Sequence, residues 1–183
     1  MPTPSRTSLD AITAAGGDIL DTRGLPGLTM QAVAQAVGVK PPSLYKHVAD
    51  RDALVGLVAD AAATDLATHL ARRGGVAGLA GRGELAGLAR SLRAWATAHP
   101  ERFRLVFSGH GSPEVAAAAG APLLKAARDL VGPADKLSAA RLLTAWATGF
   151  ISMELAGAFQ LGGNVDAAFE YGIGRLTAAL HEG

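Results

Sequence analysis

The stretch Thr29–Val48, TMQAVAQAVGVKPPSLYKHV, decides the fold of this chain, because it has the pattern of two short helices joined by a tight turn. Thr29 can accept a hydrogen bond from an otherwise unpaired backbone N–H at a helix start, and Gly38 stands where a helix ends. A pair of prolines follows, and proline is tolerated in the first turn of a helix. The stretch therefore predicts a helix-turn-helix whose second helix carries residues 43–48.

The second of these helices has one apolar and one polar face. Leu44 and Val48 are four residues apart and are expected to point inward. No Asp or Glu occurs from Thr22 to Ala49. A surface that approaches phosphates excludes carboxylates, because each would add repulsion to a largely electrostatic binding energy; the alternative is chance in a chain of which only 18% is charged. The polar face that remains consists of Ser43, Tyr45, Lys46 and His47.

Composition limits the class of protein. The 183 residues suffice for one core of fair size or two small ones. A hydrophobic content of 49% excludes a disordered chain, and the absence of cysteine excludes disulfides and thiolate chemistry. No signal peptide and no run of about 18 uninterrupted apolar residues is found, so we expect a soluble cytoplasmic protein without a membrane partner.

Outside the central stretch the apolar residues recur at helical spacing, and no alternating strand pattern is present. We therefore expect an all-α fold. Residues 1–6 form a polar arm, Thr7 and Asp10 resemble a capping box, and the glycine-rich stretch 74–83 is the best candidate for a domain boundary. About nine helices are expected, near 7–23, 29–37, 40–48, 50–73, 84–98, 103–107, 113–131, 134–161 and 164–180.

Residues 9–70 resemble the DNA-binding half of the TetR family of bacterial transcriptional regulators. The resemblance implies a three-helix helix-turn-helix domain over 1–50, a linking helix over 51–73, and a C-terminal helical domain for effector binding and dimerisation over 74–183. The residues that carry it are Leu28-Thr29-Met30, Val33-Ala34, Ala36-Val37-Gly38-Val39, Ser43-Leu44-Tyr45-Lys46-His47-Val48 and Arg51-Asp52-Ala53-Leu54.

This resemblance, with the polar face, gives a set of expected DNA-binding residues. Lysine can reach guanine acceptors or the backbone, and serine can bond either a base edge or a phosphate. Tyr45 and His47 resemble the family's phosphate-contacting pair, although each residue taken alone is also compatible with a solvated surface. The full set is Thr29, Lys40, Pro42, Ser43, Tyr45, Lys46 and His47.

An effector site is expected in the C-terminal domain. Its candidate residues are mostly aromatic, and an ordinary packed core is the alternative for each of them. A carboxylate such as Glu154 that interrupts an apolar helix face must be solvated, paired or ligand-facing. The candidates are Trp95, Phe103, Phe107, Trp146, Phe150, Met153 and Glu154.

The function that follows from the resemblance is a homodimeric repressor that binds a pseudo-palindromic double-stranded DNA operator. The last two helices would form the dimer interface, and an apolar small-molecule effector would release the DNA. No catalytic or metal-binding motif and no nucleotide-binding glycine pattern is found, so we expect no enzyme activity, no metal and no cofactor. The alternative is a helical small-molecule-binding protein or enzyme whose helix-turn-helix is only structural.

Overall fold

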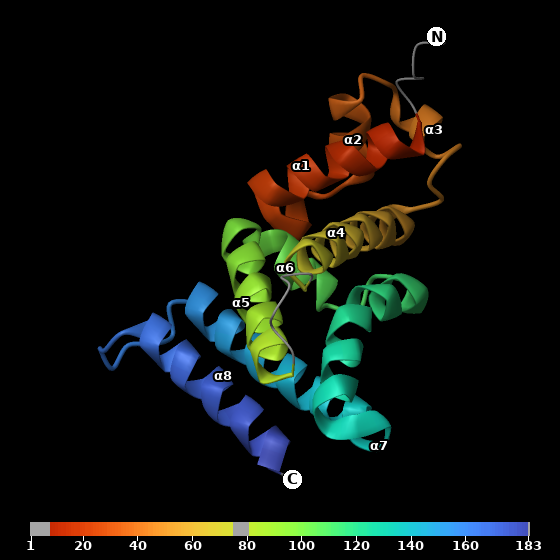
Figure 1. Cartoon of the computed structure of the whole chain (residues 1–183). Helices are drawn as coiled ribbons and strands as arrows, with labels where there is room; N and C mark the ends of the chain where they lie inside the picture. The colour runs from red at the N-terminus through yellow and green to blue at the C-terminus, as the bar shows by residue number, and fades with distance from the viewer. Residues whose placement is uncertain (1–7, 75–80, 183) are drawn as a thin grey trace. The chain divides into compact units, whose positions relative to one another are not determined.

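The computed structural model describes residues 8–74 and 81–182, and within them every regular element is a helix (Figure 1). The arm over 1–6, Thr7 of the expected capping box and the centre of the glycine-rich stretch lie outside the described residues. The helices are α1 (Leu9–Gly27), α2 (Met30–Ala36), α3 (Pro41–Leu44), α4 (Arg51–Gly74), α5 (Arg82–Ala98), α6 (Pro100–Val106), α7 (Pro113–Leu155) and α8 (Val165–Glu182).

The described residues form eight helices, one fewer than expected, because residues 113–155 form one element. Gly132 still interrupts this helix, with φ 82° and ψ 175°, directly before Pro133. The expected boundary between two helices is therefore present as a break inside α7. The helix also ends earlier than expected, at Leu155. Gly157 has φ +63°, and Ala158 and Gly157 donate to the carbonyls of Met153 and Glu154, which closes the helix in a Schellman motif.

The chain packs into two compact units: unit 1 comprises Met1–Asp65 and His99–Ala118, and unit 2 comprises Leu66–Ala98 and Ala119–Gly183. Helices α4 and α7 each contribute residues to both units. This division by packing differs from a division at the glycine-rich stretch, because α6, which follows that stretch, packs against α1.

Unit 1 is built around α1, α2, α3, α6 and the first half of α4. Ser8 caps α1 by accepting a hydrogen bond from Ala11 N at 3.1 Å. A Cβ placed on Gly16 would lie 2.6 Å from Cγ2 of Val58, so glycine permits the close approach of α1 and α4. The shared core contains Ile12, Ile19, Leu20, Leu28, Met30, Val33, Ala34, Leu44, Val48, Leu54, Val55, Val58, Ala59 and Leu105.

Unit 2 is built around α5, most of α7, and α8, which packs against α5. Its largest fully buried side chains include Leu85, Ile151, Phe169 and Ile173. The ring of Trp146 lies 5.2 Å from that of Phe169, centroid to centroid. Apolar residues from three helices thus meet in one core.

One helix resembles a membrane span in length and composition. Residues Arg51–Arg72 of α4 have a mean hydropathy of 1.2, and 44% of the most apolar window is buried inside the protein. Asp60 and Asp65 interrupt this stretch, and its apolar residues Leu54 and Val58 lie in the core of unit 1. The core helix of a soluble protein has the same composition.

Candidate nucleic-acid interface

The first helix of the helix-turn-helix begins and ends as its sequence predicts. Thr29 is the N-cap of α2, and its hydroxyl oxygen accepts a hydrogen bond from Ala32 N at 3.1 Å. Gly38 has φ +74° and donates to Gln35 O at 3.2 Å, while Val39 donates to Ala34 O at 2.9 Å. These two bonds form a Schellman motif, which requires a residue that adopts a left-handed conformation without strain.

The second helix is shorter than expected. Helix α3 covers only Pro41–Leu44, and residues 45–47 form a turn rather than a continued helix. The His47 N–H donates to Leu44 O, three residues back, at 2.9 Å, so the chain tightens there into a 3₁₀-type turn. No side chain caps the start of α3. The two prolines at its start have no N–H groups that would need a partner.

The two faces of this segment are separated as predicted. Leu44 is 0% exposed and Val48 is 2% exposed, and both belong to the core of unit 1. Ser43 is half-buried like Thr29, and Tyr45 is 54% exposed. The remaining members of the expected set, Lys40, Pro42, Lys46 and His47, are exposed. For the seven residues that are expected to bind DNA we use the name DNA face; they are Thr29, Lys40, Pro42, Ser43, Tyr45, Lys46 and His47.

The positive charges of the DNA face have no ion-pair partner in the described part of the chain. Across residues 8–74 and 81–182, no ion pair involves Lys40, Lys46 or His47. His47 also lines an open groove of about 480 Å³ whose rim includes Asp52 and His110. The lysine ammonium groups therefore remain available to an anionic partner.

One residue that sequence reasoning left without a role supports this segment. Arg51, the first residue of α4, donates from Nε to Leu28 O at 3.0 Å and from Nη2 to Leu25 O at 2.9 Å. Leu25 belongs to the last turn of α1, beyond its break at Gly24, and Leu28 is the C-cap directly before Thr29. No sequence signal identifies this contact, because it joins residues 23 and 26 positions apart.

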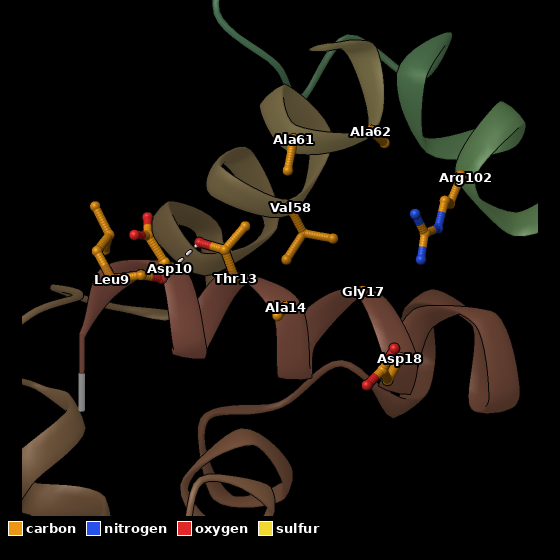
Figure 2. A pocket seen from close by; sticks show the side chains of 10 residues that line it. All are labelled: Leu9, Asp10, Thr13, Ala14, Gly17, Asp18, Val58, Ala61, Ala62 and Arg102. Carbon is orange, nitrogen blue, oxygen red and sulfur yellow. Dashed lines mark hydrogen bonds between the residues drawn. The ribbon is translucent and has the colours of Figure 1, made fainter. Parts of the chain in front are cut away.

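A groove of about 450 Å³ lies elsewhere in unit 1, between α1, α4 and α6. Figure 2 shows Arg102 at one end of it, beside Gly17 on α1. Arg102 donates to Asp21, with Nε 3.0 Å from both carboxylate oxygens and Nη2 2.6 Å from Oδ2. This hydrogen bonding raises the pKa of Arg102. The ion pair joins α6 to α1, and the groove is lined by Leu9, Asp10, Thr13, Ala14, Gly17, Asp18, Val58, Ala61, Ala62 and Arg102.

The seven residues expected at an effector site do not all lie in one unit. Phe103 and Phe107 belong to unit 1, where their ring centroids are 5.1 Å apart. The other five belong to unit 2. Trp146 and Phe150 lie 5.7 Å apart and both contact Phe169. Trp95 is buried, and Met153 is exposed.

The structure decides between the three roles that the sequence left open for Glu154. Arg93 on α5 donates from Nε to Glu154 Oε2 at 2.7 Å and from Nη2 to Oε1 at 2.5 Å. The carboxylate is therefore paired. The guanidinium of Arg93 also contacts Asp166, at 2.7 Å.

An apolar cavity of about 50 Å³ lies in unit 2. Pockets for small molecules usually measure roughly 300–1,000 Å³, so this cavity is too small for such a ligand without rearrangement. It is lined by Leu70, Leu85, Leu88, Ala89, Leu92, Leu123, Leu143, Thr144 and Ala147.

Comparison with known proteins identifies both parts of the chain. Residues 6–58 match the model of the bacterial regulatory proteins of the tetR family, and residues 85–176 match a tetracyclin repressor-like C-terminal domain. The HTH-type transcriptional regulator Rv0681 of Mycobacterium tuberculosis, itself uncharacterised, is 31% identical over 185 residues, covering 97% of this chain and 83% of the relative. The chain belongs to the TetR family of transcriptional regulators.

Solved structures show that this TetR-family chain shares its fold with proteins of its own length. A protein of unknown function from Rhodococcus sp. RHA1 superposes with a TM-score of 0.82 at 23% identity, covering 98% of this chain and 97% of that one. BioQ with its natural double-stranded DNA operator superposes with a TM-score of 0.70 at 29% identity, covering 95% and 98%. The likeness extends over the N-terminal and C-terminal parts, so the chain is an all-α, DNA-binding regulator of this family.

Proposed function

We propose that this TetR-family regulator is a homodimeric repressor that binds a pseudo-palindromic operator through its DNA face. One observation carries the proposal. Leu44 and Val48 fix the segment in the core of unit 1, while the intervening Tyr45, Lys46 and His47 are all exposed. The exposed charge of this segment is positive, because it contains Lys46 and no carboxylate occurs between Thr22 and Ala49.

Each member of the DNA face has chemistry suited to a part of the duplex. The ammonium groups of Lys40 and Lys46 fit guanine acceptors or phosphates. The hydroxyl of Thr29 accepts from Ala32 N and still has its O–H to donate to a phosphate. Tyr45 and His47 are assigned to the backbone, and Ser43, which is half-buried, to a base edge or phosphate. Pro42 offers an exposed apolar contact of the kind that packs on a thymine methyl group.

The dimer is assigned to α7 and α8, on their exposed faces. Leu142 on α7 is 47% exposed and Tyr171 on α8 is 68% exposed. A Cβ added to Gly149 or Gly174 would meet no atom within 4 Å, so both helices offer glycines at which a second copy can approach closely. Two-fold symmetry would place two DNA faces roughly 34–36 Å apart, which matches successive turns of the major groove.

The effector is assigned to unit 2. Its apolar cavity of about 50 Å³ must expand to admit a small apolar molecule. An effector that binds only the expanded conformer shifts the population toward it, whereas equal affinity for both conformers would shift nothing. The protein would act in the cytoplasm, where its DNA lies, without catalysing a reaction.

Selection of bound fragments from a random DNA pool tests the proposal. The wild-type protein should enrich a palindrome whose half-sites are about ten base pairs apart, centre to centre. A variant with Lys40 and Lys46 both replaced by alanine should enrich no sequence. Selection of unrelated sequences by the wild-type protein, or an unchanged palindrome from the double variant, would contradict the assignment of the DNA face.

A further inference from the structure

The side chain of Arg51 turns back from the start of α4 onto the end of α1. Its Nε lies 3.0 Å from Leu28 O and its Nη2 lies 2.9 Å from Leu25 O. In the described part of the chain no carboxylate lies within ion-pair distance of this guanidinium. Its polar partners there are backbone carbonyls.

Both carbonyls lie beyond a break in α1. Gly24, with φ 65° and ψ −178°, interrupts the helix shortly before its end. Leu25 O, in the single turn that follows, also accepts from Leu28 N at 3.2 Å, and Leu28 is the C-cap. A carbonyl oxygen accepts a charge-assisted hydrogen bond from a guanidinium. The start of α4, where Arg51 itself stands, is the positive end of that helix's dipole and disfavours a cation. The favourable partner of this guanidinium is therefore the end of α1.

The edge of the guanidinium that faces α1 is one of the two edges that an arginine can use on DNA. Nε and Nη2 form the planar fork that binds a phosphate or a guanine through two parallel hydrogen bonds. In this structure both atoms of the fork are engaged by Leu25 and Leu28. Binding of a phosphate through this fork would require Arg51 to release both carbonyls.

We infer that Arg51 is a positioning residue for operator binding, which holds the end of α1 on α4 and does not bind phosphate. Leu28 O, which it bonds, belongs to the residue directly before Thr29, so Arg51 fixes the start of α2 and with it part of the DNA face. This inference rests on the proposed function, because it concerns the geometry of the same DNA face.

The test uses the full-length protein and the DNA fragment that the wild type selects from a random pool. Affinity for this fragment and for a scrambled fragment is measured over a range of salt concentrations. The variants are Arg51→Lys, which keeps the charge but loses the planar fork, and Arg51→Gln, which loses the charge. Arg72→Gln, an exposed position near the other end of α4, is the control for losing one positive charge on this helix, and urea denaturation gives the folded fraction of each variant.

A positioning role predicts that Arg51→Lys and Arg51→Gln both weaken binding to the selected fragment by about tenfold, the loss expected from one or two charge-assisted hydrogen bonds. The slope of log affinity against log salt stays within 0.3 of wild type (about a third of one phosphate contact), and affinity for the scrambled fragment falls by less than about twofold. The control should bind as wild type does.

Three results would overturn the inference. Near wild-type affinity of Arg51→Lys, with a slope reduced by about 0.9 in Arg51→Gln, would show a phosphate contact. Equal losses on both fragments would show a role in folding alone, and unchanged affinity in both variants would show no role. Absence of any selected sequence for the wild type would instead refute the proposed function, and this inference with it.

Discussion

The guanidinium of Arg93 forms a two-point ion pair with Glu154, with N–O distances of 2.7 and 2.5 Å. It lies 4.9 Å above the ring of Phe169 and also contacts Asp166. The side chains of Arg93 and Glu154 are only 16% and 25% exposed, whereas that of Asp166 is 81% exposed. Hydrogen bonding to Glu154 raises the pKa of Arg93, so one cation joins α5, α7 and α8 at any physiological pH.

Replacing members of this ion-pair network should reduce the free energy of unfolding in a fixed order. Arg93→Met should cost the most, about 2–4 kcal/mol, because it leaves two carboxylates without their cation. Glu154→Gln should cost about 1–2 kcal/mol, and the exposed control Asp166→Asn less than about 0.5 kcal/mol. Urea denaturation measures all three values. A cost for Asp166→Asn equal to that for Glu154→Gln would contradict the role of burial.

Gly172 on α8 is required by its contact with Trp146. A Cβ at this position would lie 2.3 Å from Cζ2 of the indole ring, so Gly172→Ala should destabilise the protein by about 1–3 kcal/mol. The control Gly87→Ala on α5 meets no atom within 4 Å and should be neutral or stabilising by up to about 1 kcal/mol. Thermal and urea unfolding of both variants checks the difference, and equal stabilities would show that Trp146 moves aside freely.

The ion pair between Arg90 and Glu170 predicts a small pH dependence of stability. The hydrogen bond from Arg90 lowers the pKa of Glu170 from its ordinary value of 4.5. A carboxylate with a lowered pKa stabilises the folded state above its unfolded pKa, and this contribution is lost as the pH falls through the folded pKa. Both side chains are about half exposed, so the contribution should be at most about 0.5 kcal/mol.

Unfolding free energies of wild type and Glu170→Gln at pH 7 and pH 3 measure this contribution. The variant should be less stable than wild type at pH 7, and this difference should become smaller at pH 3. Asp135→Asn, which removes a carboxylate without an ion pair in the described part of the chain, should follow wild type at both values. A constant difference between wild type and Glu170→Gln would refute the ion-pair contribution.

The DNA face predicts different salt behaviour for a charged and a neutral residue. Lys46→Ala should weaken binding to all sequences and reduce the slope of log affinity against log salt by about 0.9, because one phosphate is no longer neutralised. Tyr45→Ala should weaken binding without changing the slope, since a neutral hydroxyl releases no counterion. Fluorescence anisotropy with labelled duplexes gives both quantities. Lys125→Ala on α7 serves as the charge-matched control, and the assignment fails if its slope changes as much as that of Lys46→Ala.

The proposed dimer face predicts that Leu142→Glu produces a folded monomer. The leucine is 47% exposed within one chain, so a carboxylate is tolerated by the isolated fold but would be buried unpaired between two copies. Sedimentation velocity and circular dichroism measure assembly and folding. Leu9→Glu, at a leucine of similar exposure on α1, should remain dimeric. An intact dimer for Leu142→Glu would place the interface elsewhere.

Ile173 illustrates how helical periodicity alone misleads the choice of such variants. It recurs on the apolar face of α8, as an interface residue would, but it is fully buried within one chain. A charged residue there would disrupt unit 2 whether or not a dimer forms. Exposure in the tertiary structure is needed to separate core positions from interface positions on the same helix.

The elements that the sequence predicted well are those whose ends are set by local chemistry. Thr29 and Gly38 delimit α2 because a side-chain oxygen and a residue with positive φ satisfy the helix termini within a few residues. The all-α class followed from apolar spacing, and the described helices and the match to the TetR family confirm it. The early end of α7 at Leu155 was missed, although Gly157 provides the same local signal.

Contacts between segments far apart in the chain could not be predicted from the sequence. It left open whether Glu154 is solvated, paired or ligand-facing, because its partner Arg93 is 61 residues away, and it gave no role to Arg51. It grouped Phe103 and Phe107 with five residues that belong to the other unit.

The amino-acid sequence by itself determined that the chain is helical, that a helix-turn-helix lies over Thr29–Val48, and that one face of it carries positive charge without carboxylates. Helix caps, turns and apolar periodicity depend on residues close together in the chain, so they can be predicted from the sequence directly. The tertiary structure alone decided which carbonyls Arg51 bonds and which cation neutralises Glu154. Those pairings depend on how far apart the helices pack, and no pattern among neighbouring residues determines that distance.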